Sequence, residues 1–346
     1  MIIHRRLFLA GASAAAMLPR SAFAATAEGI EALHEAARSE GEVTWYTAHY
    51  SSETAERMGQ RFTQIYPGVR VNVVRTTAQV AYQRLNQDLQ SRVNNCDVFG
   101  STVIAHFVDL KSRGLMMPYA PLRKDEVHPQ FRDLDDGDHF HVTSSGPINL
   151  VYNTNRVSEA DAPKRWTDLL DEKWNRQVAV GHPGYSGYVG NWVVLMREKY
   201  GWEYFENLAA LDPHIGRSII DVVTTVASGE RLVGAGPGTT ASLSASRGNP
   251  IANVSPEDGT VVIIAPSGIM ADATHPNAAK LFMEFLLGPE TAEIIADEFG
   301  SPIRPGAPLR EGVADLGEVP TITATSDQLQ TGIPEVTEAW RDTFGI

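Results

Sequence analysis

The stretch that decides the fold is residues 42–75, EVTWYTAHYSSETAERMGQRFTQIYPGVRVNVVR. Glu42–Tyr46 is typical of a strand, and the segment Thr54–Tyr66 carries apolar side chains at helical spacing, namely Met58, Phe62 and Ile65. Pro67 and Gly68 end that helix, and Val69–Arg75 then alternates like a second strand. A strand, a helix and a strand of these lengths predict one parallel βαβ unit.

The same alternation continues outward from this unit in both directions. A helix is expected before it, at Ile30–Arg38, and a second amphipathic helix after it, marked by Leu85, Leu89 and Val93. The later elements that we expect are strands at Cys96–Gly100, Gln177–Val180, Leu232–Ala235 and Val261–Ala265, and helices at Ala105–Arg113, Tyr188–Tyr200 and Ala278–Leu287. Strands alternating with helices along the whole chain predict an α/β fold.

Two extended segments, 142–152 and 259–266, are placed to carry the chain from one lobe to another and back. The length of 346 residues suits two domains of roughly 150 residues each. We therefore expect two lobes, each a mainly parallel sheet flanked by helices, joined by two hinge crossovers. Residues 25–143 plus 264–346 are predicted to form lobe 1, and residues 144–263 lobe 2.

Composition narrows the class of protein. The chain is 43% hydrophobic and 21% charged, which is ordinary for a globular protein and excludes a disordered chain or a coiled coil. The formal net charge of −13 argues against a nucleic-acid-binding surface. The one cysteine, Cys96, allows neither an intramolecular disulfide nor a cysteine-based zinc site.

The first 24 residues have the order of an export signal. Arg5 and Arg6 precede an apolar stretch that ends near Leu18, and 22–24 (AFA) offers a small-x-small cleavage site. The stretch is shorter than the roughly 20 residues that span a bilayer, so we expect no membrane anchor. The paired arginines followed by Phe8 and Leu9 resemble a twin-arginine signal, although His4 and Ala10 depart from that pattern. The sequence predicts a periplasmic protein processed after Ala24.

The loops at the carboxyl ends of the predicted strands are where an open α/β sheet binds its ligand. These loops are 47–52, 101–102, 182–187 and 236–240. His49 and Tyr50 occupy the first of them, where contact with a ligand and packing against the next loop are equally compatible with the sequence.

Three motifs that suggest other chemistry do not meet its requirements. Gly234–Gly238 lacks the spacing of a dinucleotide loop, and Pro237 removes a backbone donor. Gly184–Gly187 (GYSG) is half of a hydrolase elbow, because Tyr188 occupies the place of the second glycine. His139 and His141 lie among acidic residues in a stretch for which we favour a surface turn over a metal site. A secreted hydrolase stays the main alternative of another class, but no nucleophile with an adjacent base is visible.

Several segments, in order, resemble a periplasmic solute-binding protein of an ABC importer. They resemble extracellular solute-binding family 1, in the group that contains ferric-iron-binding and phosphonate-binding proteins. Asp97, Val98, Phe99 and Ser101 match its D-V-F-x-S segment. The other matching segments are 226–230 (VASGE), 256–260 (PEDGT), 275–280 (HPNAAK) and 285–290 (FLLGPE). The resemblance implies the two-lobed type II periplasmic-binding-protein fold, no enzyme activity and an ABC permease as partner.

The iron ligands of that family do not carry over. The adjacent tyrosines that grip Fe(III) in the ferric-binding relatives fall on Thr239 and Thr240, and the acidic ligand after D-V-F-x-S falls on Thr102. Threonine hydroxyls do not ionise at neutral pH, so we rank a small organic anion (a phosphonate, phosphate ester or carboxylate) above ferric iron. Hydroxyls and helix N-termini suit an oxyanion.

The expected ligand-binding residues share a position at a strand end, a helix start or a crossover. They are Thr47, His49, Tyr50, Ser101, Thr102, Ser145, Tyr185, Ser186, Gly187, Tyr188, Thr239 and Thr240. Arg75 and His182 are further sources of charge-assisted hydrogen bonds. We expect a monomer without a cofactor or a structural metal, with no catalytic residues and no nucleic-acid partner.

Overall fold

The computed structural model describes residues 20–346 except 312, 314, 317–319 and 325. Residues 1–19 of the predicted export signal (residues 1–24) therefore lie outside the described residues. Residues 20–24 belong to helix α1 (Arg20–Arg38), of which the predicted helix at Ile30–Arg38 is the second half. No helix in the described part of the chain is long and apolar enough to cross a membrane.

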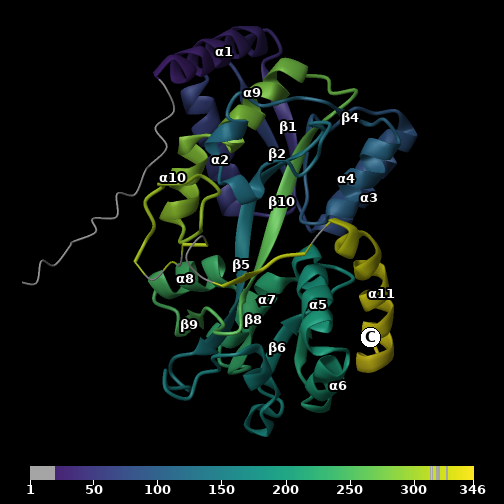
Figure 1. Cartoon of the computed structure of the whole chain (residues 1–346), viewed down its shortest axis with the longest axis vertical. Coiled ribbons are helices and arrows are strands. Elements are labelled where there is room, and N and C mark those ends of the chain that lie inside the picture. Colours follow the sequence, from purple (N-terminus) through teal and green to yellow (C-terminus); the bar gives the residue numbers. More distant parts are fainter. Residues whose placement is uncertain (1–19, 312, 314, 317–319, 325) are drawn as a thin grey trace, which may run out of the picture.

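Figure 1 shows two lobes, one above the other along the long axis. In the upper lobe, lobe 1, the parallel strands β1, β2 and β3 lie in the order β2-β1-β3 and are flanked by helices. The strands are β1 (Glu42–Thr47), β2 (Arg70–Arg75), β3 (Val98–Gly100) and β4 (Met116–Met117). The helices besides α1 are α2 (Ser52–Ile65), α3 (Ala78–Ser91), α4 (Ile104–Ser112), α9 (Pro276–Leu286) and α10 (Pro289–Asp297), with short 3₁₀ turns at Lys124–Glu126 and Pro129–Phe131.

The lower lobe, lobe 2, repeats this plan with its own parallel strands, β8, β6 and β7, in the order β8-β6-β7. Its strands are β6 (Val178–Gly181), β7 (His214–Gly216), β8 (Val233–Pro237) and β9 (Ile251–Val254). Its helices are α5 (Gly187–Tyr200), α6 (Glu203–Ala210), α7 (Ile219–Ala227) and α8 (Gly238–Ser246), with 3₁₀ turns at Trp166–Leu170 and Glu172–Trp174. The two-lobed α/β architecture agrees with the prediction.

Two long strands join the lobes, as the extended segments predicted. β5 (His141–Asn153) and β10 (Thr260–Met270) pair antiparallel at the waist of the molecule and make one continuous sheet of both lobes. The register shifts between Ala265 and Pro266, so that Thr143 is left over on β5 as a bulge. Ser144 and Ser145 follow this bulge at the level where the lobes meet.

The C-terminal helix differs from its predicted place. The predicted boundaries put α11 (Ser326–Phe344) in lobe 1, but it packs along α5 and α6 of lobe 2 and also touches α4 of lobe 1. The chain reaches it through β11 (Thr321–Ile322), which pairs with the start of β10. Trp340 lies fully buried beside Phe205, and this burial of apolar surface holds α11 on lobe 2.

Each lobe has its own aromatic core, one on either side of the crossing of β5 and β10. In lobe 1, Trp45 packs edge-on against Phe282, with ring centroids 5.1 Å apart. In lobe 2, Trp192 packs edge-on against Phe205 at 5.6 Å. All four side chains are less than 2% exposed. Large aromatic side chains of this kind dominate core stability.

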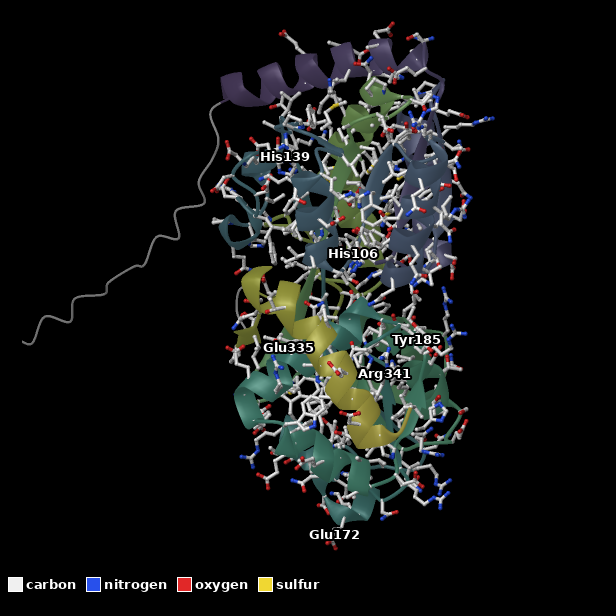
Figure 2. All side chains as sticks on the ribbon, turned by 90° about the vertical axis from the view of Figure 1, so that its right-hand side faces the viewer. His106, His139, Glu172, Tyr185, Glu335 and Arg341 are labelled. Atoms are coloured by element: carbon white, nitrogen blue, oxygen red, sulfur yellow. The ribbon has the colours of Figure 1, made fainter. Side chains whose placement is uncertain are left out.

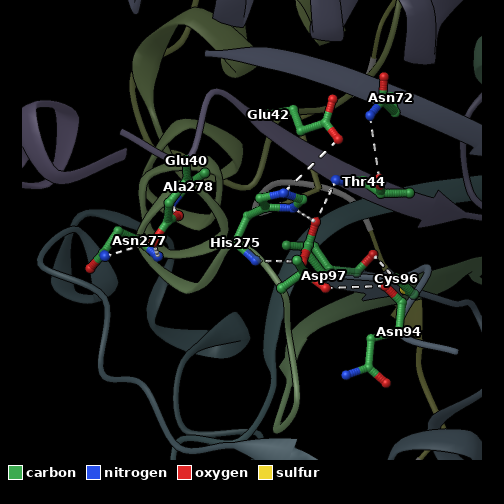
Figure 3. Close-up of polar contacts among 12 residues, drawn as sticks. Glu40, Glu42, Thr44, Asn72, Asn94, Cys96, Asp97, His275, Asn277 and Ala278 are labelled. Carbon is green, nitrogen blue, oxygen red and sulfur yellow. Dashed lines mark hydrogen bonds and ion pairs between the residues drawn. The ribbon is translucent and has the colours of Figure 1, made fainter. Parts of the chain in front are cut away.

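Asp97, in the segment D-V-F-x-S, ties three elements of lobe 1 together (Figure 3). Its carboxylate accepts from the backbone N–H of Thr44 at 2.8 Å and of His275 at 3.0 Å, and it contacts His275 Nδ1 at 2.9 Å. Glu40 beside it accepts from the backbone N–H of Asn277 and Ala278, at the start of α9. These hydrogen bonds, which are called the Asp97–His275 knot below, fix α9 against β1 and β3.

Two local predictions were wrong. Val93 does not continue the helix of Leu85 and Leu89, because Arg92 takes the left-handed conformation (φ 56°) and ends α3. The stretch around His139 and His141 is not a surface turn throughout. Asp135 is buried against Lys111 and His139, and His141 begins β5 with its ring nitrogen 2.7 Å from Tyr119 O.

Candidate functional site

A cavity lies between the lobes at the level of the β5–β10 crossing. Its volume, including the part that is open to solvent, is about 950 Å³. Lobe 1 lines it with the loop after β1, the end of β2, the start of α3 and the end of α10. Lobe 2 lines it with the first residues of α5, α7 and α8. Concave sites of this size between two domains are the usual place for a small ligand.

Nine of the twelve predicted ligand-binding residues line this cavity. They are His49, Tyr50, Thr102, Ser145, Ser186, Gly187, Tyr188, Thr239 and Thr240. They come from four loops and one crossover strand. The parallel strands within each lobe end on the side that faces the other lobe, so the loops that follow them meet in the cleft.

Thr47, Ser101 and Tyr185 lie elsewhere. Thr47 is the buried last residue of β1, and its carbonyl accepts from Thr76 N. Tyr185 is 44% exposed, with the Arg217 guanidinium over its ring, near the edge of the lower lobe in Figure 2. His182, named as a further charged donor, contacts Trp340 and Tyr185 and does not line the cavity.

Ser101 makes the kind of contact that a hydrolase needs, but in the wrong environment. Its Oγ lies 3.0 Å from His106 Nδ1, and His106 stacks on Tyr82 with ring centroids 4.1 Å apart. Ser101 has no exposed surface, and its Oγ also accepts from Val103 N. Burial lowers the pKa of His106 to about 3. The pair therefore holds the start of α4 and has no access to a substrate.

Three helices of the two lobes begin at the cavity without a capping side chain. These are α3 in lobe 1 after Thr77, and α5 and α8 in lobe 2 after Ser186 and Pro237. The first N–H groups of a helix have no partner within the helix, and the helix dipole makes that end positive. Uncapped N-termini facing a cavity favour an oxyanion there.

Arg75 supplies a full positive charge at the same place. It is the last residue of β2, is half-buried, and donates from Nε to Tyr50 O at 2.6 Å. No carboxylate lies within ion-pair distance of its guanidinium among the described residues. Burial lowers the pKa of Arg75 from its ordinary value, because the charged form loses hydration. A buried cation without a counter-charge is stabilised by an anion.

The two lobes touch each other inside the cavity. Tyr188 Oη of α5 lies 2.9 Å from His49 Nδ1 of lobe 1, and the rings stack with an interplanar angle of 13°. Asn191 of α5 donates to Thr102 O at 3.1 Å. At Gly187 a Cβ atom would come 2.4 Å from Thr102 Oγ1, so only glycine allows this approach. The structure is therefore that of a closed cleft.

Burial decides the protonation of the aromatic groups at this contact. It lowers the pKa of His49 to about 3, so the imidazole is neutral and shares a hydrogen bond between Nδ1 and the Tyr188 hydroxyl. Burial also raises the pKa of Tyr50 and of Tyr188 far above the ordinary value. Ionising either phenol therefore costs more free energy here than in water.

Glu298 and Thr54 are the polar groups of the cavity on its α2–α10 side. Glu298 is 8% exposed, accepts from Thr54 Oγ1 at 2.5 Å and pairs with Arg57 Nη1 at 3.3 Å. Within the described residues no cluster of three histidine, cysteine or acidic side chains could hold a metal ion. Thr239 and Thr240 follow the N-cap residue Pro237 of α8 and do not cap it themselves.

Sequence reasoning missed several residues that line the cavity, chiefly Thr77, Ser144, Ser218 and Glu298. Thr77 and Ser218 do precede helices, and this position is a usable signal. Ser144 lies within a strand, and Glu298 arrives from the far end of α10, where no local pattern marks it.

Residues 96–315 match a family described as bacterial extracellular solute-binding proteins. The chain belongs to this family. A relative of Haemophilus influenzae, named only as an uncharacterized protein, is 28% identical over 193 residues, which cover 52% of this chain and 55% of the relative. A probable ABC transporter periplasmic-binding protein of Sinorhizobium fredii is 32% identical over 72 residues, 21% of this chain and 20% of that protein. The chain thus spans about half the length of the first relative and a fifth of the second.

Solved structures share the fold over most of the chain. The periplasmic binding protein AfuA of Actinobacillus pleuropneumoniae, with fructose-6-phosphate bound, superposes with a TM-score of 0.79 and 21% identity, covering 88% of this chain and 99% of that chain. Iron-bound HitA of Pseudomonas aeruginosa superposes with a TM-score of 0.73 and 19% identity, covering 87% and 99%. These likenesses confirm the expected type II periplasmic-binding-protein fold.

Proposed function

We propose that this solute-binding protein is the periplasmic receptor of an ABC importer and captures a small organic anion between its lobes. The ligand-binding residues are the nine predicted residues that line the cavity, together with Arg75. Binding favours the closed form over the open one, and the closed form is delivered to the permease. The hinge is formed by 142–152 and 259–266, and the predicted lobe boundaries apply except for α11. Export by the twin-arginine route is part of the proposal.

One observation carries the choice of an anion: the Arg75 guanidinium reaches the cavity without a carboxylate partner among the described residues. The uncapped starts of α3, α5 and α8 add backbone donors around it. An anion bound there makes charge-assisted hydrogen bonds, worth about 1.5–3 kcal/mol each. A phosphate ester, a phosphonate or a carboxylate satisfies this donor set.

Ferric iron, the metal of iron-bound HitA, fits this cavity less well. No cluster of three histidine, cysteine or acidic side chains that could hold a metal ion is found among the described residues, and Glu298 is already paired with Arg57. A hydrolase is disfavoured because Ser101 is sealed from the cavity.

The test is isothermal titration of the full-length exported protein with phosphate esters, phosphonates, carboxylates and ferric citrate. We expect one organic anion to bind without turnover. Arg75→Met should weaken that binding by roughly ten- to hundredfold, while Arg217→Met, at a guanidinium outside the cavity, should not change it. Tight binding of Fe(III) with the visible colour of tyrosinate, or an Arg75→Met variant with unchanged anion affinity, would contradict the proposal.

A further inference from the structure

Two buried hydroxyl groups of the cavity wall have no hydrogen-bond partner among the described residues. They are Tyr50 Oη and Ser144 Oγ, in side chains that are 8% and 1% exposed. Buried polar atoms are almost always hydrogen-bonded, and leaving one unpaired costs about as much free energy as a hydrogen bond contributes. Two such atoms on the wall of one cavity therefore need an explanation.

The two hydroxyls cannot fully satisfy each other. Ser144 lies near enough to Tyr50 to lower the pKa of the phenol against the effect of burial, but a hydroxyl has one donor and two acceptor positions, so a contact between the two still leaves an O–H without an acceptor. Ser144 stands on β5 opposite Ala265 of β10, whose side chain offers no polar group. Both side chains line the cavity, so a ligand there can supply the missing partner.

Glu298 brings an acceptor to the same side. It is close enough for its charge to raise the pKa of Tyr50, and its two oxygens each hold one donor, from Arg57 and Thr54. A carboxylate has about four acceptor positions, so capacity remains. Its charge is already balanced by Arg57, which makes a neutral donor a better fit than a cationic one.

The backbone and the phenol of Tyr50 have different polar neighbours. The Arg75 guanidinium donates to the backbone carbonyl of Tyr50, whereas Ser144 and Glu298 are the side chains that shift the pKa of its phenol in addition to burial. The cavity thus has an anion-binding end and, at the far end of Tyr50, a neutral hydrogen-bonding end.

We propose that Tyr50, Ser144 and Glu298 form a subsite for a hydroxyl group, and that the solute is a small organic anion that carries a hydroxyl a short carbon chain away from its anionic group. The inference rests on the proposed function, because Arg75 must hold the anionic group. The subsite selects hydroxylated anions: a ligand without the hydroxyl leaves two buried polar groups unpaired.

The test compares matched probes by isothermal titration. The phosphate series is glycerol phosphate, propyl phosphate and aminopropyl phosphate, and the carboxylate series is glycerate, propionate and β-alanine. In at least one series we expect the hydroxylated probe to bind at least roughly tenfold more tightly than its alkyl counterpart. Tyr50→Phe and Ser144→Ala should each bring this ratio close to one. Tyr66→Phe, which removes a phenol hydroxyl away from the cavity, should leave the ratio as it is.

A second readout separates a ligand contact from a structural one. Tyr50→Phe removes an unpaired buried hydroxyl, so the melting temperature of the unliganded protein should not fall. A fall of several degrees would overturn the inference, and so would equal affinity of the alkyl and hydroxylated probes or a preference for the amino probes. In those cases Arg75→Met should still weaken all binding, which keeps the proposed function. Failure of every probe to bind would contradict both.

Discussion

Two polar clusters of this protein contain the same kinds of group and differ in how their hydrogen bonds are satisfied. In the Asp97–His275 knot of lobe 1, each carboxylate oxygen of Asp97 has a donor from the chain itself. In the cavity, Arg75 has no carboxylate partner and Tyr50 Oη has no partner at all among the described residues. The first cluster is complete without a ligand, and the second is not.

This difference separates groups that hold the fold from groups that bind a solute. A satisfied buried carboxylate stabilises the folded state, and removing it leaves several donors unpaired. An unsatisfied buried group costs stability in the unliganded protein and returns that free energy when a ligand arrives. Variants of the two clusters should therefore change different quantities: stability for the knot, and affinity for the cavity.

The largest expected effect is at the knot. Asp97→Ala leaves the backbone N–H groups of Thr44 and His275 without an acceptor, and we expect a loss of about 3–5 kcal/mol in the free energy of unfolding. Asp125→Ala is the control, because that side chain is 82% exposed and should change stability by less than about 0.5 kcal/mol. Urea denaturation measures both. A stable Asp97→Ala variant with impaired ligand binding would reverse the assignment of the two clusters.

The knot also explains why the family was visible in the sequence. Asp97 and His275 lie in two of the segments that carried the resemblance, and here they join β3, β1 and α9. The alternation of strands and helices was equally local, so β1, α2, β2 and β5 were predicted nearly to their ends, whereas β10 runs four residues beyond the predicted end at 266. The end of α3 was missed, because Arg92 adopts a positive φ that its residue type does not announce.

The cavity was predictable only in part. Its loops follow from one rule, that parallel strands end on a common edge, and this rule placed His49, Thr102 and Thr239 on the cavity wall. The rule cannot find Ser144, within a strand, or Glu298, delivered by the return of α10 to lobe 1. The rule also predicted Ser101 as a cavity residue, but Ser101 is fully buried and the next residue, Thr102, lines the cavity instead.

Acid should destabilise the folded protein through buried histidines, among them His49 at the contact between the lobes and His106 beside Ser101. The pKa of His49 is lowered from 6.5 to about 3 by burial, and that of His106 likewise. Below pH 6.5 the two histidines therefore bind protons in the unfolded chain but not in the folded protein. Stability is complete above pH 6.5 and falls as the pH drops toward 3, by up to about 1.4 kcal/mol per pH unit for each histidine. Thermal melts between pH 7 and 4 measure this slope.

Replacing His49 by Gln isolates the part of this pH dependence of stability that comes from the contact between the lobes. The slope of stability against pH should become shallower without vanishing, because burial also lowers the pKa of His106, His141 and His182. A slope that does not change in His49→Gln would mean that this imidazole is already exposed to solvent in the unliganded protein, and that the cleft is open there.

The two threonines at the start of α8 should affect ligand affinity and leave stability alone. Thr239→Ala or Thr240→Ala removes one hydroxyl from the cavity wall, and we expect affinity for the organic anion to fall by roughly ten- to hundredfold. Pro237 is the N-cap of α8, so neither threonine is needed as a cap and the melting temperature should stay the same. Calorimetric titration measures the affinity, and thermal melts measure the stability. A lower melting temperature with normal affinity would mean that the two hydroxyls stabilise the fold and do not bind the ligand.

The smallest effect is expected at the mouth of the cleft, where a salt bridge joins the lobes. Arg247 Nη2, at the end of α8, lies 3.0 Å from each carboxylate oxygen of Glu53 in α2. Their side chains are 54% and 68% exposed, so water and salt screen the attraction, and exposed pairs of this kind contribute about 0.2–1 kcal/mol. Arg247→Ala should therefore raise the dissociation rate of the ligand at most about fivefold, and the change should vanish in roughly 1 M salt. Arg176→Ala, which breaks an exposed pair with Asp212 on lobe 2, is the matched control. An effect of Arg247→Ala on the dissociation rate that persists in high salt would show that Arg247 joins α8 to α2 through packing as well as charge. It would also show that a change at the C-terminal end of α8 reaches its N-terminal end at the cavity.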